Sequence, residues 1–117
     1  MIPPFNTETG NLPAGEHAAT WEEIVERFGR TPWRRTLLDG LRTALASLRA
    51  AGCKKVYLDG SFVTAKEEPG DFDACWEAEG VDGDLLDEAL LMFDAGRATQ
   101  KAKFGGELFV ADWPADE

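Results

Sequence analysis

The longest periodic segment of the chain runs from Thr31 to Gly52, and it predicts an amphipathic helix. Thr31 is a good N-cap residue, and the proline after it is well tolerated in a first helical turn. Apolar residues then recur at three- and four-residue spacing until the glycine at 52 ends the pattern. The expected inner face consists of Leu37, Leu38, Leu41, Ala44, Leu45 and Leu48. Such a face has to be buried against another layer of the fold.

A shorter helix is expected directly before this segment, over residues 20–29. Thr20 and Glu23 have the spacing of a capping box, and Gly29 is a stop signal. Three later segments are short, rich in strand-forming residues and bounded by turn residues. We expect strands over 54–59, 72–77 and 107–113, and a further helix over 84–95 with Asp84 as its cap.

The expected order is helix, helix, strand, strand, helix, strand, which predicts an α/β protein of the α+β type. Its helices would pack against one small mixed β-sheet. Residues 1–19 hold three prolines and two glycines, so we expect an extended or partly disordered lead-in to a single domain over 20–117. The residues expected to be largely buried are Trp21, Ile24, Leu38, Leu41, Leu45, Leu48, Val56, Trp76, Leu90 and Phe93.

Charge is unevenly distributed along the chain. Residues 1–55 carry eight basic and six acidic residues, whereas residues 56–117 carry four basic and sixteen acidic ones. The acidic half repels phosphate backbones, so general nucleic-acid binding is not expected. No apolar run approaches the length of a membrane span, and the first residues lack a signal-peptide pattern, so we expect a cytoplasmic protein with no membrane partner.

The segment LDGSFVTAKEEPGDFDAC, over residues 58–75, contains most of the candidate functional residues. On a strand, Asp71 and Asp73 would project from the same face, roughly 7 Å apart along the chain. Two such carboxylates favour a cation between them, and Mg²⁺ prefers oxygen ligands. Gly60 permits a close backbone approach, and Ser61 offers a hydroxyl and an amide to a phosphate group.

Three lysines have two interpretations each. Lys66 is either a phosphate contact or a solvated loop lysine beside two glutamates. Lys101 and Lys103 either approach the acidic site, where they would neutralise a triphosphate, or they stabilise the last turn of a helix. The sequence leaves these alternatives open.

The pattern Gly60-Ser61, then nine residues, then Asp71-Phe72-Asp73 resembles the nucleotidyltransferase superfamily typified by DNA polymerase beta. The segments LPAGEH, TWEEI, GSFVTAKEEPGDFD and QKAKFGGELF are similar to sequences of a bacterial family of small nucleotidyltransferase-like proteins. This resemblance covers most of the chain. It implies a minimal nucleotidyltransferase-like fold.

The resemblance also implies a third acid on a later strand, and Glu107 and Asp112 are the two candidates. On a regular strand they face opposite sides, so only one of them serves, and we favour Glu107 because it follows a glycine pair. The implied catalytic residues and Mg²⁺ ligands are Asp71, Asp73 and Glu107. The implied nucleotide-binding residues are Gly60, Ser61 and Lys66.

The implied activity is Mg²⁺-dependent transfer of a nucleoside monophosphate from a nucleoside triphosphate to a protein or RNA acceptor. Small members of the superfamily act as antitoxins of toxin–antitoxin pairs, so a partner toxin is also implied. A fold does not by itself determine an activity. The alternative is a non-catalytic module of the same fold, whose acidic half binds and neutralises a basic partner.

Overall fold

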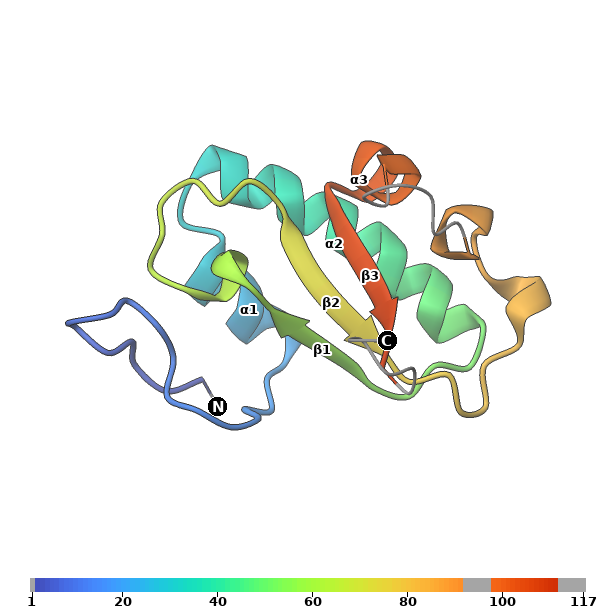
Figure 1. Cartoon of the computed structure of the whole chain (residues 1–117), viewed down its shortest axis with the longest axis horizontal. Helices are drawn as coiled ribbons and strands as arrows, with labels where there is room; N and C mark the ends of the chain where they lie inside the picture. The colour runs from blue at the N-terminus through green and yellow to red at the C-terminus, as the bar shows by residue number, and fades with distance from the viewer. Residues whose placement is uncertain (1, 92–97, 112–117) are drawn as a thin grey trace.

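In the computed structural model, which describes residues 2–91 and 98–111, three α-helices and a three-stranded mixed sheet form an α+β fold (Figure 1). The predicted fold class is therefore confirmed, and the first two helices and the three strands follow in the predicted order. The elements are α1 (Trp21–Phe28), α2 (Pro32–Ala50), β1 (Val56–Asp59), β2 (Phe72–Trp76), α3 (Ala98–Phe104) and β3 (Gly106–Val110).

The first two helices begin as their capping signals predict. The Thr20 hydroxyl accepts the Glu23 backbone N–H at 3.2 Å, and the Glu23 carboxylate accepts the Thr20 N–H at 3.0 Å. At the start of α2, the Thr31 hydroxyl accepts the backbone N–H of Arg34 at 3.1 Å. None of the described helices combines the length and the apolar character that crossing a membrane requires.

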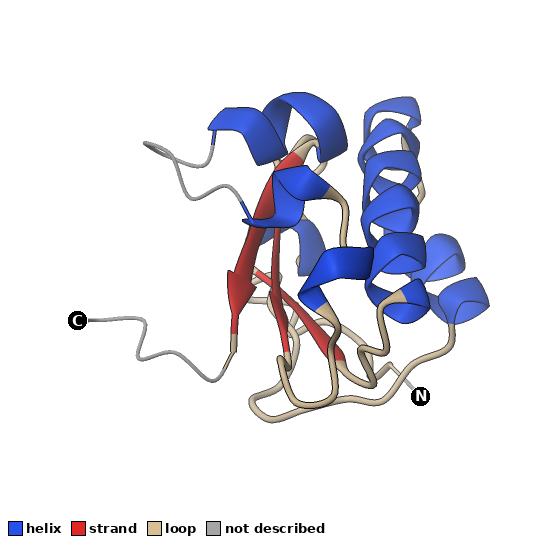
Figure 2. Cartoon of the chain, turned by 90° about the vertical axis from the view of Figure 1, so that its right-hand side faces the viewer, coloured by secondary structure: helices blue, strands red, loops and turns tan. Residues whose placement is uncertain are grey.

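The sheet has the order β1-β2-β3, with β1 antiparallel to β2 and β2 parallel to β3. Figures 1 and 2 show α1 and α2 on one side of this sheet. Strands β2 and β3 alternate between buried and half-buried residues, so one face of each packs on the helices. The other face places the exposed Asp59 and the half-buried Asp73 and Glu107 in register across the three strands.

The core prediction is correct for the centre of the fold and too generous at its border. Of the residues expected to be buried, Leu38, Leu41, Leu48, Trp76 and Leu90 are buried. Those that are only partly buried against this core are Trp21, Ile24, Leu45 and Val56. Phe93 lies outside the described residues. The helical stripes were therefore recognised, but the sequence does not say how far the sheet covers each stripe.

The helix predicted over 84–95 is wrong for its described part. Two short 3₁₀ turns, Gly83–Leu85 and Glu88–Leu91, stand there, and Asp82 rather than Asp84 caps the first of them. The backbone of Leu86 between the turns is extended, with ψ of 146°. Residues 92–97 are not described. Helix α3 follows this segment, at residues that were not predicted to form a helix.

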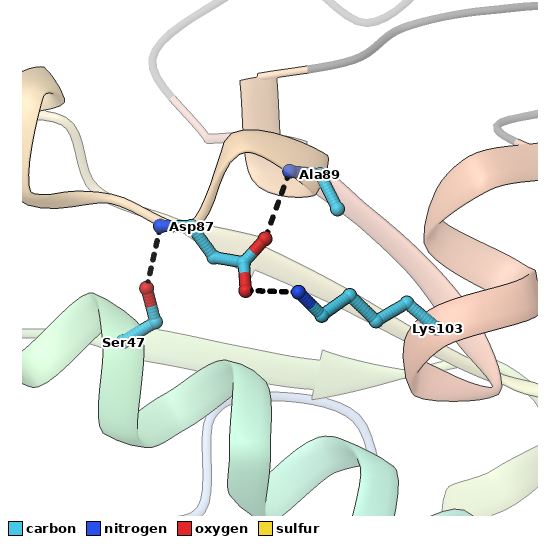
Figure 3. Close-up of polar contacts among 4 residues, drawn as sticks. All are labelled: Ser47, Asp87, Ala89 and Lys103. Carbon is cyan, nitrogen blue, oxygen red and sulfur yellow. Dashed lines mark hydrogen bonds and ion pairs between the residues drawn. The ribbon is translucent and has the colours of Figure 1, made fainter.

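The segment with the 3₁₀ turns is fastened to two helices through Asp87 (Figure 3). Its backbone N–H donates to the Ser47 hydroxyl of α2 at 2.8 Å, and its carboxylate accepts the Ala89 N–H at 2.9 Å. The same carboxylate pairs with Lys103 of α3. Lys103 and then the Ala89 N–H lower the pKa of Asp87. Lys103 is thus engaged here rather than at the predicted site.

The N-terminal segment has no helix or strand over its described residues 2–20, and side chains hold it to the fold. The Arg27 guanidinium donates to the carbonyls of Ile2, at 3.0 Å, and Pro3, at 2.7 Å. The same guanidinium lies 5.1 Å from the centre of the Phe5 ring. Ile2 itself is buried, so the segment contributes to the core.

Candidate metal and nucleotide site

Three carboxylates meet at one end of the parallel strand pair. Asp71, Asp73 and Glu107 each offer an oxygen atom, and these oxygens lie within 4.8 Å of one another. Asp73 and Glu107 are partners in the register of β2 and β3. Asp71 immediately precedes β2, two residues before Asp73. The structure therefore brings together the three acids singled out in the sequence, whereas Asp112 lies outside the described residues.

Two glycines permit this close arrangement. Gly60 directly follows β1 and has a positive φ of 77°, and a Cβ atom there would overlap the Asp73 carboxylate. At the start of β3, a Cβ atom on Gly106 would overlap the carbonyl and ring of Phe72. The Gly60 corner thus touches the acids directly. The glycine pair before Glu107 lets β3 begin against β2.

Asp59 is a fourth acid, and sequence reasoning did not assign it to the site. It is the last residue of β1 and is the register partner of Asp73. Its charge contributes to the electrostatics: burial first, then Asp71, Glu107 and Asp59, raise the pKa of Asp73. The sequence signal that could have found Asp59 is its position directly before the Gly60 corner.

Lys101 of α3 approaches the same cluster. Its ammonium lies 3.2 Å from a Glu107 oxygen and 3.9 Å from an Asp71 oxygen. The structure thus separates two lysines that the sequence could not distinguish, since Lys103 pairs with Asp87 instead. When ionised, three carboxylates and one ammonium leave a net charge of −2 at the cluster. That charge and the oxygen donors suit a divalent cation.

The two remaining residues predicted to bind the nucleotide, Ser61 and Lys66, have different surroundings. Ser61 begins a short 3₁₀ turn after Gly60 and lines a wide cleft of about 1150 Å³, which extends along β1 to the N-terminal segment. The side chain of Lys66 is exposed, and the backbone carbonyl of this residue accepts a hydrogen bond from the Arg34 guanidinium. Among the described contacts, none joins the Lys66 side chain to the acids.

Arg34 fastens the loop that follows the Gly60 corner. Its side chain is fully buried, and its guanidinium donates to the carbonyls of Phe28, Phe62, Thr64 and Lys66. Burial, and then the charge of Arg30, lower the pKa of Arg34 to about 10, so it stays charged at neutral pH. Sequence reasoning missed this residue, although it lies three positions before Leu37 on the inner stripe of α2.

Fold and site together define an α+β domain with a half-buried acidic cluster beside a glycine corner. Residues 3–117 match a protein family described as a family of unknown function (DUF6932). The match covers nearly the whole chain, so the chain belongs to this family. Comparisons with curated proteins and with solved structures give no match.

Replacing Asp73 with asparagine is expected to raise the melting temperature at pH 7. The raised pKa means that the folded protein binds this proton more tightly than the unfolded chain does. The favourable contribution of Asp73 is therefore fully present below its unfolded pKa of about 3.9, and it is lost as pH rises through the folded pKa. The gain from Asp73→Asn should shrink as pH falls toward 4.

Thermal melts of wild type and Asp73→Asn between pH 4 and pH 7 measure this difference. Glu79→Gln is the control, because Glu79 is an exposed acid near the opposite end of β2. A melting temperature that falls at pH 7, or a gain that does not depend on pH, would contradict the expected electrostatic strain.

Proposed function

We propose that the protein is a minimal Mg²⁺-dependent nucleotidyltransferase, which moves a nucleoside monophosphate from a nucleoside triphosphate to a protein or RNA hydroxyl. The observation that carries the proposal is the convergence of Asp71, Asp73 and Glu107 within 4.8 Å, next to the Gly60 corner. The resemblance of the Gly60-Ser61 to Asp71-Phe72-Asp73 pattern to known nucleotidyltransferases supports it.

The residues present fit the metal that this chemistry requires. Asp73 and Glu107 supply carboxylate oxygens from adjacent strands, and Asp71 supplies another from just before β2. All three residues are only half-buried, so an ion can reach them. Bound Mg²⁺ would supply charge neutralisation for the triphosphate and the leaving pyrophosphate. Without such neutralisation, four nearby carboxylates including Asp59 would repel the nucleotide.

The chain's own groups account for the remaining steps. The backbone at Gly60 lies against the Asp73 carboxylate, and Ser61 follows it with a hydroxyl and an amide, groups that are suited to hold a phosphate oxygen. A carboxylate of the cluster takes the proton of the acceptor hydroxyl. The acceptor oxygen then bonds to the α-phosphorus, and the bond from that phosphorus to the pyrophosphate oxygen breaks.

A partner protein of the toxin class is part of this proposal, either as the acceptor or as a bound ligand. It rests on the resemblance to small antitoxin nucleotidyltransferases. The strongly acidic half of the chain, residues 56–117, would favour a basic partner surface.

One observation favours a second function, a non-catalytic module that binds a basic partner. Lys101 already pairs with two of the three acids, as expected for a cluster balanced by a lysine instead of a metal. A basic side chain of a partner would then take the place of the cation. This function predicts strong salt dependence of partner binding and no affinity for nucleotides.

Calorimetry with each of the four nucleoside triphosphates, with and without Mg²⁺, distinguishes the two functions. We expect wild type to bind at least one of them at millimolar concentration or tighter, only with Mg²⁺. Asp71→Asn, Asp73→Asn and Glu107→Gln should each weaken this binding about tenfold or more, because the ion loses a charged ligand. The control Glu79→Gln should bind as wild type does.

Absence of any Mg²⁺-dependent binding by folded wild type would falsify the enzymatic proposal and leave the interaction module. Equal binding by wild type and the three cluster variants would show that the metal ligands lie elsewhere. Transfer of labelled nucleotide to a candidate partner, lost in the same variants, is the direct assay of activity.

A further inference from the structure

A second hollow adjoins the acidic cluster, and its walls differ from those of the cluster. It has a volume of about 350 Å³, and it lies between the start of α2, the segment before β2 and the end of α3. Two of its lining residues, Asp71 and Lys101, also belong to the acidic cluster. Its full lining consists of Trp33, Leu37, Gly70, Asp71, Lys101 and Gly105.

Trp33 provides the aromatic wall of this hollow. The side chain is 41% exposed, which is unusual for a large apolar ring, although its neighbours on the inner stripe of α2 are buried. Its position is not loose, because the indole N–H donates to the Pro69 carbonyl at 2.5 Å. The ring is therefore held at one edge while part of its surface stays accessible to a ligand.

We infer that this hollow binds the base of the nucleoside triphosphate, with Trp33 as its stacking platform. The inference rests on the proposed function, because it places the phosphates at the adjoining Asp71 and Lys101. A planar heteroaromatic ring matches an exposed indole, and base–indole stacking tolerates all four bases. Gly70 and Gly105 add no side chains to the lining, which leaves room beside the indole. Small ligands generally bind in hollows of this size that combine apolar walls with a few polar groups.

The substrate class follows from this arrangement. The hollow would recognise the base by stacking, whereas the cluster would recognise the triphosphate by charge. Inorganic tripolyphosphate therefore competes for only one of the two subsites. This difference allows the base subsite to be tested separately from metal-dependent phosphate binding.

The first test is nuclear magnetic resonance of ¹⁵N-labelled protein with adenosine, guanosine, cytidine or uridine, in the absence of Mg²⁺. The chain has four tryptophans, and the indole N–H signal of Trp33 is assigned by its loss in Trp33→Phe. We expect millimolar nucleoside to shift the Trp33 signal saturably and to leave that of buried Trp76 unchanged. An unchanged Trp33 signal overturns the base subsite, even if Mg²⁺-dependent triphosphate binding is found.

The second test compares affinities for Mg²⁺-nucleoside triphosphate and Mg²⁺-tripolyphosphate. Trp33→Ala should weaken nucleotide binding about tenfold or more and leave tripolyphosphate binding unchanged, whereas Trp33→Phe should stay within about threefold of wild type. Leu85→Ala, at an exposed apolar residue outside the hollow, is the control. If Trp33→Ala weakens the binding of both ligands equally, the inference is overturned, since Trp33 would then act on the acidic cluster. If wild type binds neither ligand, the proposed function itself is rejected.

Discussion

Arg34→Met is expected to lower the free energy of unfolding by about 3–4 kcal/mol. The Arg34 side chain is fully buried, and its guanidinium serves four backbone carbonyls. Methionine fills a similar volume, but it leaves the buried carbonyls of Phe28 and Phe62 without this donor. The carbonyls of Thr64 and Lys66 lose one donor and keep Arg30 as another. Each buried acceptor that loses its partner costs roughly 1–3 kcal/mol, which exceeds what is regained by no longer burying a charge.

Denaturant titration of Arg34→Met measures this loss, and Arg35→Met is the matched control. Arg35 is the next residue of α2 and is exposed, so its replacement should change stability by less than about 0.5 kcal/mol. Arg34→Lys should recover only part of the stability, because an ammonium lacks the planar fork that reaches several carbonyls at once. Equal stabilities of Arg34→Met and wild type would mean that the loop after Gly60 does not depend on this residue.

Gly40→Ala is expected to destabilise the protein by about 3 kcal/mol or more, although helix propensity alone predicts a gain of about 1 kcal/mol. Gly40 lies within α2, where a Cβ atom would overlap the backbone carbonyl of Phe104 at the end of α3. A backbone carbonyl cannot rotate aside as a side chain can. The two helices would have to separate, which would also move Lys101 and the start of β3.

Thermal and denaturant unfolding of Gly40→Ala test the sign of this effect. Ala46→Gly is the control, since Ala46 is an exposed position of the same helix and should show only the propensity cost of about 1 kcal/mol. A more stable Gly40→Ala protein would show that α3 is not packed directly on α2.

The features of this fold that depend on neighbouring residues in the sequence could be predicted, whereas those that depend on contacts between distant segments could not. Helix starts were predictable because Thr20 and Thr31 bond to N–H groups within three residues of themselves. The strands were recognisable from their residue types and turn boundaries, and they set the α+β class. The placement of Asp71 and Asp73 near each other follows from the two-residue period of extended backbone. Glu107 was identified by resemblance, and the register of β3 brings it to the same cluster.

Helix α3 could not be read from its own seven residues, because so short a helix is not stable without tertiary contacts. Its packing on Gly40 supplies such a contact. The buried Gln100 supplies another, since its side-chain carbonyl accepts the Leu108 N–H at 2.8 Å. The segment before α3 shows the reverse case. Its apolar spacing predicted a helix, but the bonds of Asp87 to Ala89, Ser47 and Lys103 hold it in 3₁₀ turns.

The sequence by itself determined the class of fold, the first two helices, the three strands and the proximity of Asp71 and Asp73. These features depend on caps, turns and periodicities that span only a few residues. Only the tertiary structure decided that Arg34 is buried, that Asp59 joins the acids and that Lys101 rather than Lys103 pairs with them. These outcomes depend on register and packing between segments distant in the chain, which no local pattern encodes.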